Sequence, residues 1–94
     1  MQKYEIMTIA SVSLGETGAT KVTNEVKDLI SHSGGKVLNS DNWGKRKFAY
    51  QIGQDTEGYY EVITFELDKS KVEKLKPKLN LVEGLVRYLI TAQK

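Results

Sequence analysis

The sequence predicts an α+β domain in which four antiparallel strands form one sheet and two helices cover one of its faces. Three observations indicate this class. Two segments have the three- and four-residue apolar spacing of amphipathic helices, four segments have β-forming or alternating character, and each helix lies between two strands. A chain of 94 residues is long enough for one core, so we expect residues 1–94 to form a single domain.

The first half of the chain contains a strand, a helix and a second strand. Residues 3–10 are rich in β-forming side chains, and residues 16–33 have the helical repeat. Gly34-Gly35 should end the helix, because glycine accepts the left-handed conformation found at helix ends. The segment 36–52 reads as extended, with a bulge or bend at Gly44. The helical repeat consists of Ala19, Val22, Val26, Leu29 and Ile30.

The second half repeats this order. Residues 53–58 (GQDTEG) are a predicted turn, and residues 59–67 (YYEVITFEL) are the clearest strand. Ser70-Lys71-Val72-Glu73 has the spacing of a capping box at a helix start. Pro77 should kink this helix or end it early, because proline lacks the amide donor and clashes with the preceding turn. The last strand begins at Leu81 or Leu85 and continues through Thr91.

The resulting β-α-β-β-α-β order predicts the ferredoxin-like βαββαβ fold. Each βαβ half needs a right-handed crossover, which places both helices on the same face of the sheet. No element of the sequence remains to cover the opposite face. We therefore expect this open face to be the main functional surface.

Glu61 decides which side chains of the third strand belong to the open face. We place Glu61 toward the helices, because Ile63 and Phe65 share its side of the strand and are needed for the core. The open face then combines apolar and cationic residues, which is typical of a surface that binds a partner. Scattered apolar residues are also tolerated on ordinary protein surfaces, and this alternative stays open. The open face should contain Met7, Ile9, Tyr60, Val62, Thr64, Glu66, Arg87 and Leu89.

Three consecutive cations, Lys45, Arg46 and Lys47, are the strongest binding signal in the chain. They are flanked by the aromatic residues Trp43, Phe48 and Tyr50. Cations can contact phosphates, and aromatic rings or a guanidinium plane can stack on bases, so the pattern suits RNA. The alternative is an ordinary solvated run of charge.

Signals for catalysis and metal binding are weak. The chain has no cysteine and one histidine, which excludes disulfides, thiolate zinc sites and a cysteine nucleophile. Its acidic residues are dispersed, and the loop after the first strand lacks the arginine that acylphosphatases of this topology use. Apolar runs are too short to span a membrane. The third strand also departs from the RNA-recognition motif, because Gly58-Tyr59 is followed by Tyr60 and Glu61. We expect no enzyme activity and no cofactor.

The chain resembles the bacterial small-subunit ribosomal protein six family over essentially its whole length. The resemblance rests on Lys3-Tyr4-Glu5, the block GKRKFAYQI (residues 44–52), Gly58-Tyr59 and Arg87. The block is its most specific part. The chain departs from the family pattern in Phe48, where leucine is usual, and in Pro77 within the second helix.

This resemblance implies a structural component of the bacterial small ribosomal subunit that is cytoplasmic and ribosome-associated. The family binds the central domain of small-subunit ribosomal RNA together with small-subunit ribosomal protein eighteen. We expect no membrane association and a monomer when the protein is free. A free-standing RNA-recognition or protein-interaction module of the same fold is the alternative. The expected RNA-binding residues are Lys3, Lys45, Arg46, Lys47 and Arg87. The possible stacking or partner surface is Tyr4, Met7, Trp43, Tyr50, Tyr60, Val62 and Leu89.

Overall fold

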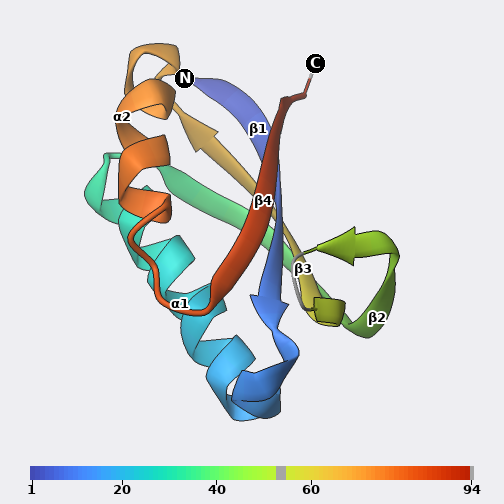
Figure 1. Ribbon diagram of the computed structural model, residues 1–94. Coiled ribbons are helices and arrows are strands. Elements are labelled where there is room, and N and C mark those ends of the chain that lie inside the picture. The colour runs from blue at the N-terminus through green and yellow to red at the C-terminus, as the bar shows by residue number, and fades with distance from the viewer. Residues whose placement is uncertain (53–54, 94) are drawn as a thin grey trace.

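Four strands and two long helices alternate in the predicted order in the computed structural model (Figure 1). The structure describes residues 1–52 and 55–93, with the backbone alone for residues 48–52 and 55–56. All strand pairs are antiparallel, and the sheet order is β2-β3-β1-β4, which is the ferredoxin-like arrangement. The elements are β1 (Gln2–Ser11), η1 (Val12–Leu14), α1 (Gly15–His32), β2 (Lys36–Ile52), β3 (Asp55–Leu67), α2 (Lys69–Leu79) and β4 (Leu85–Ala92).

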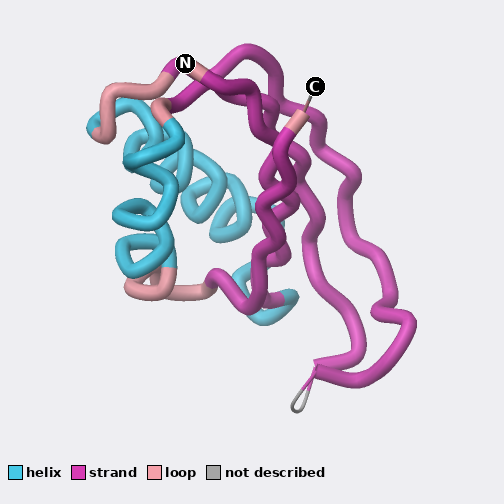
Figure 2. The backbone as a smooth tube through the Cα atoms, turned by 90° about the horizontal axis from the view of Figure 1, so that it is seen from above, coloured by secondary structure: helices cyan, strands magenta, loops and turns pink. Residues whose placement is uncertain are grey.

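Both helices pack against the same face of the sheet (Figures 1 and 2). Within the described residues, no helix covers the other face. The β2–β3 hairpin is the longest part of the sheet and extends past the layer of helices (Figure 2). The predicted two-layer architecture with one open sheet face is confirmed.

The pairing of the two central strands decides which side chains enter the core. Tyr4 lies opposite Phe65, Ile6 opposite Ile63, and Thr8 opposite Glu61. These pairs face the helices and are buried. The rings of Tyr4 and Phe65 stack with centroids 5.7 Å apart. Such an aromatic pair adds about 0.5–1.5 kcal/mol beyond the burial of its area. The prediction that Glu61 points inward is confirmed.

Helix α1 buries the predicted apolar stripe and ends as expected. Four of the five predicted residues, Ala19, Val22, Val26 and Ile30, are buried, and Leu29 is half-buried. Gly34 has a positive φ of 89°, and the Gly35 amide donates to the Ile30 carbonyl at 2.9 Å. This is how a glycine after a helix satisfies its last carbonyls.

The predicted capping box at α2 is wrong. Asp68 is the N-cap, and its carboxylate accepts hydrogen bonds from the Ser70 amide at 3.0 Å and the Ser70 hydroxyl at 2.9 Å. Helix α2 therefore begins at Lys69, and Ser70 lies in its first turn. Aspartate and serine cap helices about equally well, so residue type does not distinguish Asp68 from Ser70 as the cap. The cap is the residue at which the chain leaves β3, which is Asp68.

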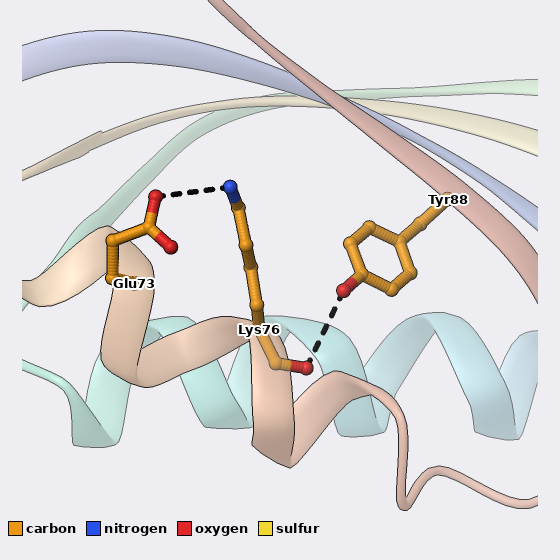
Figure 3. Close-up of polar contacts among 3 residues, drawn as sticks. All are labelled: Glu73, Lys76 and Tyr88. Atoms are coloured by element: carbon orange, nitrogen blue, oxygen red, sulfur yellow. Dashed lines mark hydrogen bonds and ion pairs between the residues drawn. The ribbon is translucent and has the colours of Figure 1, made fainter.

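Pro77 lies in the last turn of α2, which ends two residues later at Leu79. This agrees with the predicted early end. The turn is held by side-chain contacts (Figure 3). The Tyr88 hydroxyl on β4 donates to the Lys76 carbonyl at 3.4 Å, and the Lys76 ammonium lies 3.0 Å from the Glu73 carboxylate. Tyr88 thereby links the short helix to the edge strand behind it.

The hairpin differs from its predicted boundaries. Strand β3 begins at Asp55, so residues 55–58 of the predicted turn belong to the strand. The other two residues of that turn, 53 and 54, lie outside the described residues. The pairing of β2 with β3 contains three register shifts, at Val37/Asn39, at Asn42/Gly44 and between Lys47 and Ile52. The bulge predicted near Gly44 is confirmed, with a positive φ of 75° at that glycine.

The Asp68 cap predicts a stability contribution that depends on pH. The Ser70 backbone amide, and then the Ser70 hydroxyl, lower the pKa of the Asp68 carboxyl group. Because the folded state has the lower pKa, this contribution is present above the ordinary carboxyl pKa and is lost as pH falls through the lowered value. We expect Asp68→Ala to lower the melting temperature near neutral pH, and the difference from wild type to shrink in acid.

Asp68→Asn is the matched control, because asparagine still accepts the Ser70 amide bond but carries no titrating carboxyl group. This variant should keep most of the stability and lose its pH dependence. Thermal unfolding followed by circular dichroism measures both effects. If Glu73→Ala lowered the melting temperature as much as Asp68→Ala, the capping box would be restored as the explanation.

Candidate nucleic-acid interface

The open face of the sheet is built from side chains that lie in rows across neighbouring strands. Met7 lies between Val62 on β3 and Leu89 on β4, and Ile9 lies between Tyr60 and Arg87. We call Met7, Ile9, Val62 and Leu89 the apolar band. Strand alternation puts all four on the side away from the helices, as predicted.

Neighbouring side chains, rather than helices, shield the centre of the apolar band. Ile9 has an exposed fraction of 5% and Val62 of 8%, although no helix of the described residues covers this face. Leu89, at the β4 edge, is 57% exposed, and Met7 is half-buried. A partner would therefore meet Leu89 and Met7 first, and Val62 offers little accessible surface.

Two of the predicted cations lie at one end of the open face. Arg87 is opposite Ile9, while Arg46 on β2 is opposite Gly58, two positions from Tyr60 on the same side of β3. Lys3 is opposite Glu66 at the other end of the sheet. Six residues of strand separate Lys3 from Ile9, or about 20 Å. Lys3 therefore belongs to a different part of the surface from the two arginines.

Trp43 and Arg46 form one unit at the β2 edge. Trp43 is the extra residue of the bulge between Asn42 and Gly44, and it is 47% exposed. The Arg46 guanidinium carbon lies 5.4 Å from the centre of the Trp43 ring, and Arg46 Nε donates to the Trp43 carbonyl at 3.2 Å. These contacts hold the guanidinium in one orientation and leave further N–H donors for an anion. The unit combines a flat exposed ring with a positioned cation.

The three consecutive cations do not face one partner side by side. Lys45 is opposite Tyr59 and Lys47 is opposite Glu57, so both point to the helix side of the hairpin, whereas Arg46 points to the open face. The Lys45 ammonium lies 3.9 Å from the Glu57 carboxylate. Strand alternation thus separates the charges and lowers their mutual repulsion.

Tyr4 and Tyr60, two of the predicted aromatic residues, lie on opposite sides of the sheet. Tyr4 is 6% exposed and stacked on Phe65 in the core, so its assignment to an exposed stacking surface is wrong. Tyr4 shares the helix side of β1 with Ile6, which is why the core takes it. The Tyr50 side chain lies outside the described residues. Tyr60 is half-buried on the open face, in the row of Ile9 and Arg87.

The described part of the chain contains neither a metal-binding cluster nor a membrane-spanning helix. Among those residues, no group of three or more histidine, cysteine, aspartate or glutamate side chains is arranged to hold a metal ion. No helix there is long and apolar enough to cross a membrane. The chemistry that this surface offers is cation–anion contact, ring stacking and apolar docking.

These features define a class: a ferredoxin-like domain with one open sheet face that is cationic at one end. A family model described as Ribosomal protein S6 matches residues 3–92. The small ribosomal subunit protein bS6 of Fusobacterium nucleatum is 37% identical over 93 residues, covering 99% of both chains. The protein of the same name from Thermoanaerobacter pseudethanolicus is 39% identical over 90 residues, covering 96% of this chain and 95% of its own.

A solved structure agrees with this assignment. The crystal structure of 30S ribosomal protein S6 from Thermotoga maritima has a TM-score of 0.91 and 28% sequence identity, and the match covers 98% of this chain and 87% of that one. The chain belongs to the Ribosomal protein S6 family. It is a structural protein of the small ribosomal subunit and not an enzyme.

The two faces of β4 predict losses of stability of different size for the same substitution. Leu89 lies exposed on the open face, while the adjacent Ile90 packs against the core. We expect Leu89→Thr to lower the free energy of unfolding by less than about 1 kcal/mol. Ile90→Thr should lower it by about 2 kcal/mol, because it removes a partly buried methyl group that packs against the core and introduces a hydroxyl there. Urea unfolding measures both, and equal losses would contradict the assignment of faces.

Proposed function

We propose that this chain binds small-subunit ribosomal RNA, together with small-subunit ribosomal protein eighteen, during assembly of the small subunit. The observation that carries the proposal is the open sheet face of a Ribosomal protein S6 family member, with Arg46 and Arg87 at one end of its apolar band. The face provides two kinds of contact. The cationic end suits a phosphate backbone, and the apolar band suits a protein.

The charge distribution supports RNA at the hairpin end of the sheet. Arg46 is oriented by Trp43, and an arginine held in place loses less conformational freedom when it binds a phosphate. Net charge is only +2, so the affinity depends on where the cations lie more than on their number. The opposite end of the face, where Lys3 pairs in register with Glu66, is electrically mixed.

The apolar band supports a protein partner beside the RNA. Leu89 and Met7 form its accessible part, close to the β4 edge. Exposed apolar side chains rimmed by polar ones are typical of surfaces that another protein covers. A protein bound there would be adjacent to Arg87, so the protein and the RNA would contact neighbouring positions of the open face.

A double variant at the hairpin tests the RNA interaction. We expect Arg46→Ala combined with Lys47→Ala to weaken binding to a fragment of the central domain of small-subunit ribosomal RNA without unfolding the domain. For each phosphate that the variant no longer neutralises, the slope of log affinity against log salt concentration should become shallower by about 0.9 or less. Filter binding across a salt series, with and without protein eighteen, measures affinity and slope.

Lys71→Ala combined with Lys74→Ala is the charge-matched control, because both lysines are exposed on α2. This variant should change the slope much less. Unchanged affinity and slope in a folded hairpin variant would reject the RNA interaction. Sedimentation tests the free-standing module as the alternative, since a ribosomal component should travel with the small subunit and dissociate in high salt.

A further inference from the structure

A groove with a mixed polar and apolar lining lies on the helix side of the sheet, between α1 and the β2–β3 hairpin. Its volume is about 440 Å³. Helix α1 contributes Asn24 and Lys27 to its lining, and the hairpin contributes Ser40, Asn42, Tyr59 and Glu61. The groove is separate from the apolar band, because strand alternation turns these hairpin side chains to the other side of the sheet.

Glu61 is the unusual feature of this groove. It occupies a position in the core-facing row of β3 and has an exposed fraction of 9%. Within the described residues, the Ser40 hydroxyl donates to Glu61 Oε2 at 2.6 Å. A carboxylate has about four acceptor positions, so the Ser40 bond leaves further acceptor capacity on Glu61 for a ligand in the groove. Burying a carboxylate is costly unless donors compensate it, which favours a ligand rich in N–H groups.

The donors of the groove lie beside this acceptor. Asn42 Oδ1 accepts the Gly44 amide at 2.7 Å, which leaves the Asn42 side-chain nitrogen as a donor. Lys27 is half-buried in the lining and adds an ammonium group. Tyr59 adds an aromatic ring. The groove thus combines a strong acceptor, neighbouring donors and a ring.

Among the described residues that line the groove, Lys27 is the cation, and Glu16 and Glu61 are the acidic residues. Lys45 and Lys47 lie on the same side of β2 as Asn42. Lys45 pairs with Glu57, and Lys47 lies further along the hairpin, opposite Glu57 in register, so Lys27 is the cation that a ligand in the groove would meet. Lys27 in one part of the lining and the Glu61 carboxylate in another fit a ligand with a phosphate at one end and N–H donors at the other.

From this arrangement we infer that the groove binds one unpaired guanine nucleotide of an RNA strand. Guanine presents two adjacent donors, N1–H and the 2-amino group, which match a carboxylate, and its O6 acceptor lies next to them. Glu61 accepts the two donors, Asn42 donates to O6, and Lys27 contacts the phosphate. Sequence-specific RNA recognition commonly reads unpaired bases along this edge. The inference rests on the proposed function, since it supplies a second contact for the same RNA.

An arginine side chain of a partner protein is the competing occupant, because a guanidinium also offers paired donors to a carboxylate. An arginine fits the groove less well, because a guanidinium has no acceptor for the Asn42 side-chain nitrogen and would lie in the same groove as the Lys27 ammonium. A guanine nucleotide offers its O6 to Asn42 and its phosphate to Lys27. The hydrogen-bond donors of the lining therefore favour the nucleotide.

Amide NMR of the isotope-labelled full chain, titrated with guanosine 5′-monophosphate, tests the inference. Resonances of the groove residues should shift, and those of the apolar band should not. Inosine 5′-monophosphate, which lacks the 2-amino group, should bind about tenfold more weakly, as expected when one of two paired hydrogen bonds is removed. Adenosine and cytidine monophosphates should bind more weakly still. Glu61→Gln should reduce guanosine monophosphate affinity at least tenfold while preserving the Ser40 hydrogen bond.

Lys27→Gln is a second variant that keeps the inference testable if Glu61→Gln fails to fold. It should weaken binding of all four monophosphates several-fold and leave the guanine preference intact. Equal shifts with inorganic phosphate would overturn the inference, because only the phosphate would then be recognised. Shifts with N-acetylargininamide but none with guanosine monophosphate would overturn it in favour of a partner arginine.

The groove and the proposed function can fail independently. If Arg46→Ala with Lys47→Ala weakens ribosomal RNA binding but the groove shows no guanine preference, the proposed function stands and this inference falls. If the wild-type chain does not bind ribosomal RNA, the proposed function falls, and a guanine preference measured with the mononucleotide still assigns the groove.

Discussion

The antiparallel register between β1 and β3 is the constraint on which the rest of the structure depends. It places Tyr4 against Phe65, Ile6 against Ile63 and Thr8 against Glu61 on the helix side. A shift by one residue would exchange the two faces of a strand and put Met7 and Ile9 under the helices. Because the core needs the larger set of buried apolar side chains, the register is strongly specified. The same register decides which side chains form the open face, so the composition of that face follows from the register.

The helices and strands could be predicted because their signals are periodic and local. The apolar stripe of α1, the glycines after it and the alternation of β3 each indicate one structure. The start of α2 could not be predicted as reliably. Asp68 and Ser70 are both good caps, and the choice between them depends on where the chain leaves β3. The length of the hairpin was missed for a similar reason, since glycine and acidic residues usually mark turns.

The surface was harder to predict than the fold, because it depends on how strands pair. Lys45, Arg46 and Lys47 are adjacent in the sequence, yet the hairpin register sends them to different faces. Tyr4 has the residue type of a stacking platform but occupies a core position. The groove beside α1 had one sequence signal, the carboxylate of Glu61 at an apolar position. Its shape depends on how far α1 lies from β2, and local patterns contain no information about that distance.

The bulges of β2 at Leu38 and Trp43 bear on how copies of this protein behave at high concentration. An outer strand with a regular backbone ladder is a template onto which a strand of another molecule can add, and that growth leads to aggregation. The register shifts at Leu38 and Trp43 interrupt this ladder along the longest strand of the sheet, and Lys36, Lys45 and Lys47 add charge to it. Residues that shape a binding surface on one side of the hairpin thus also keep its outer margin from recruiting further chains.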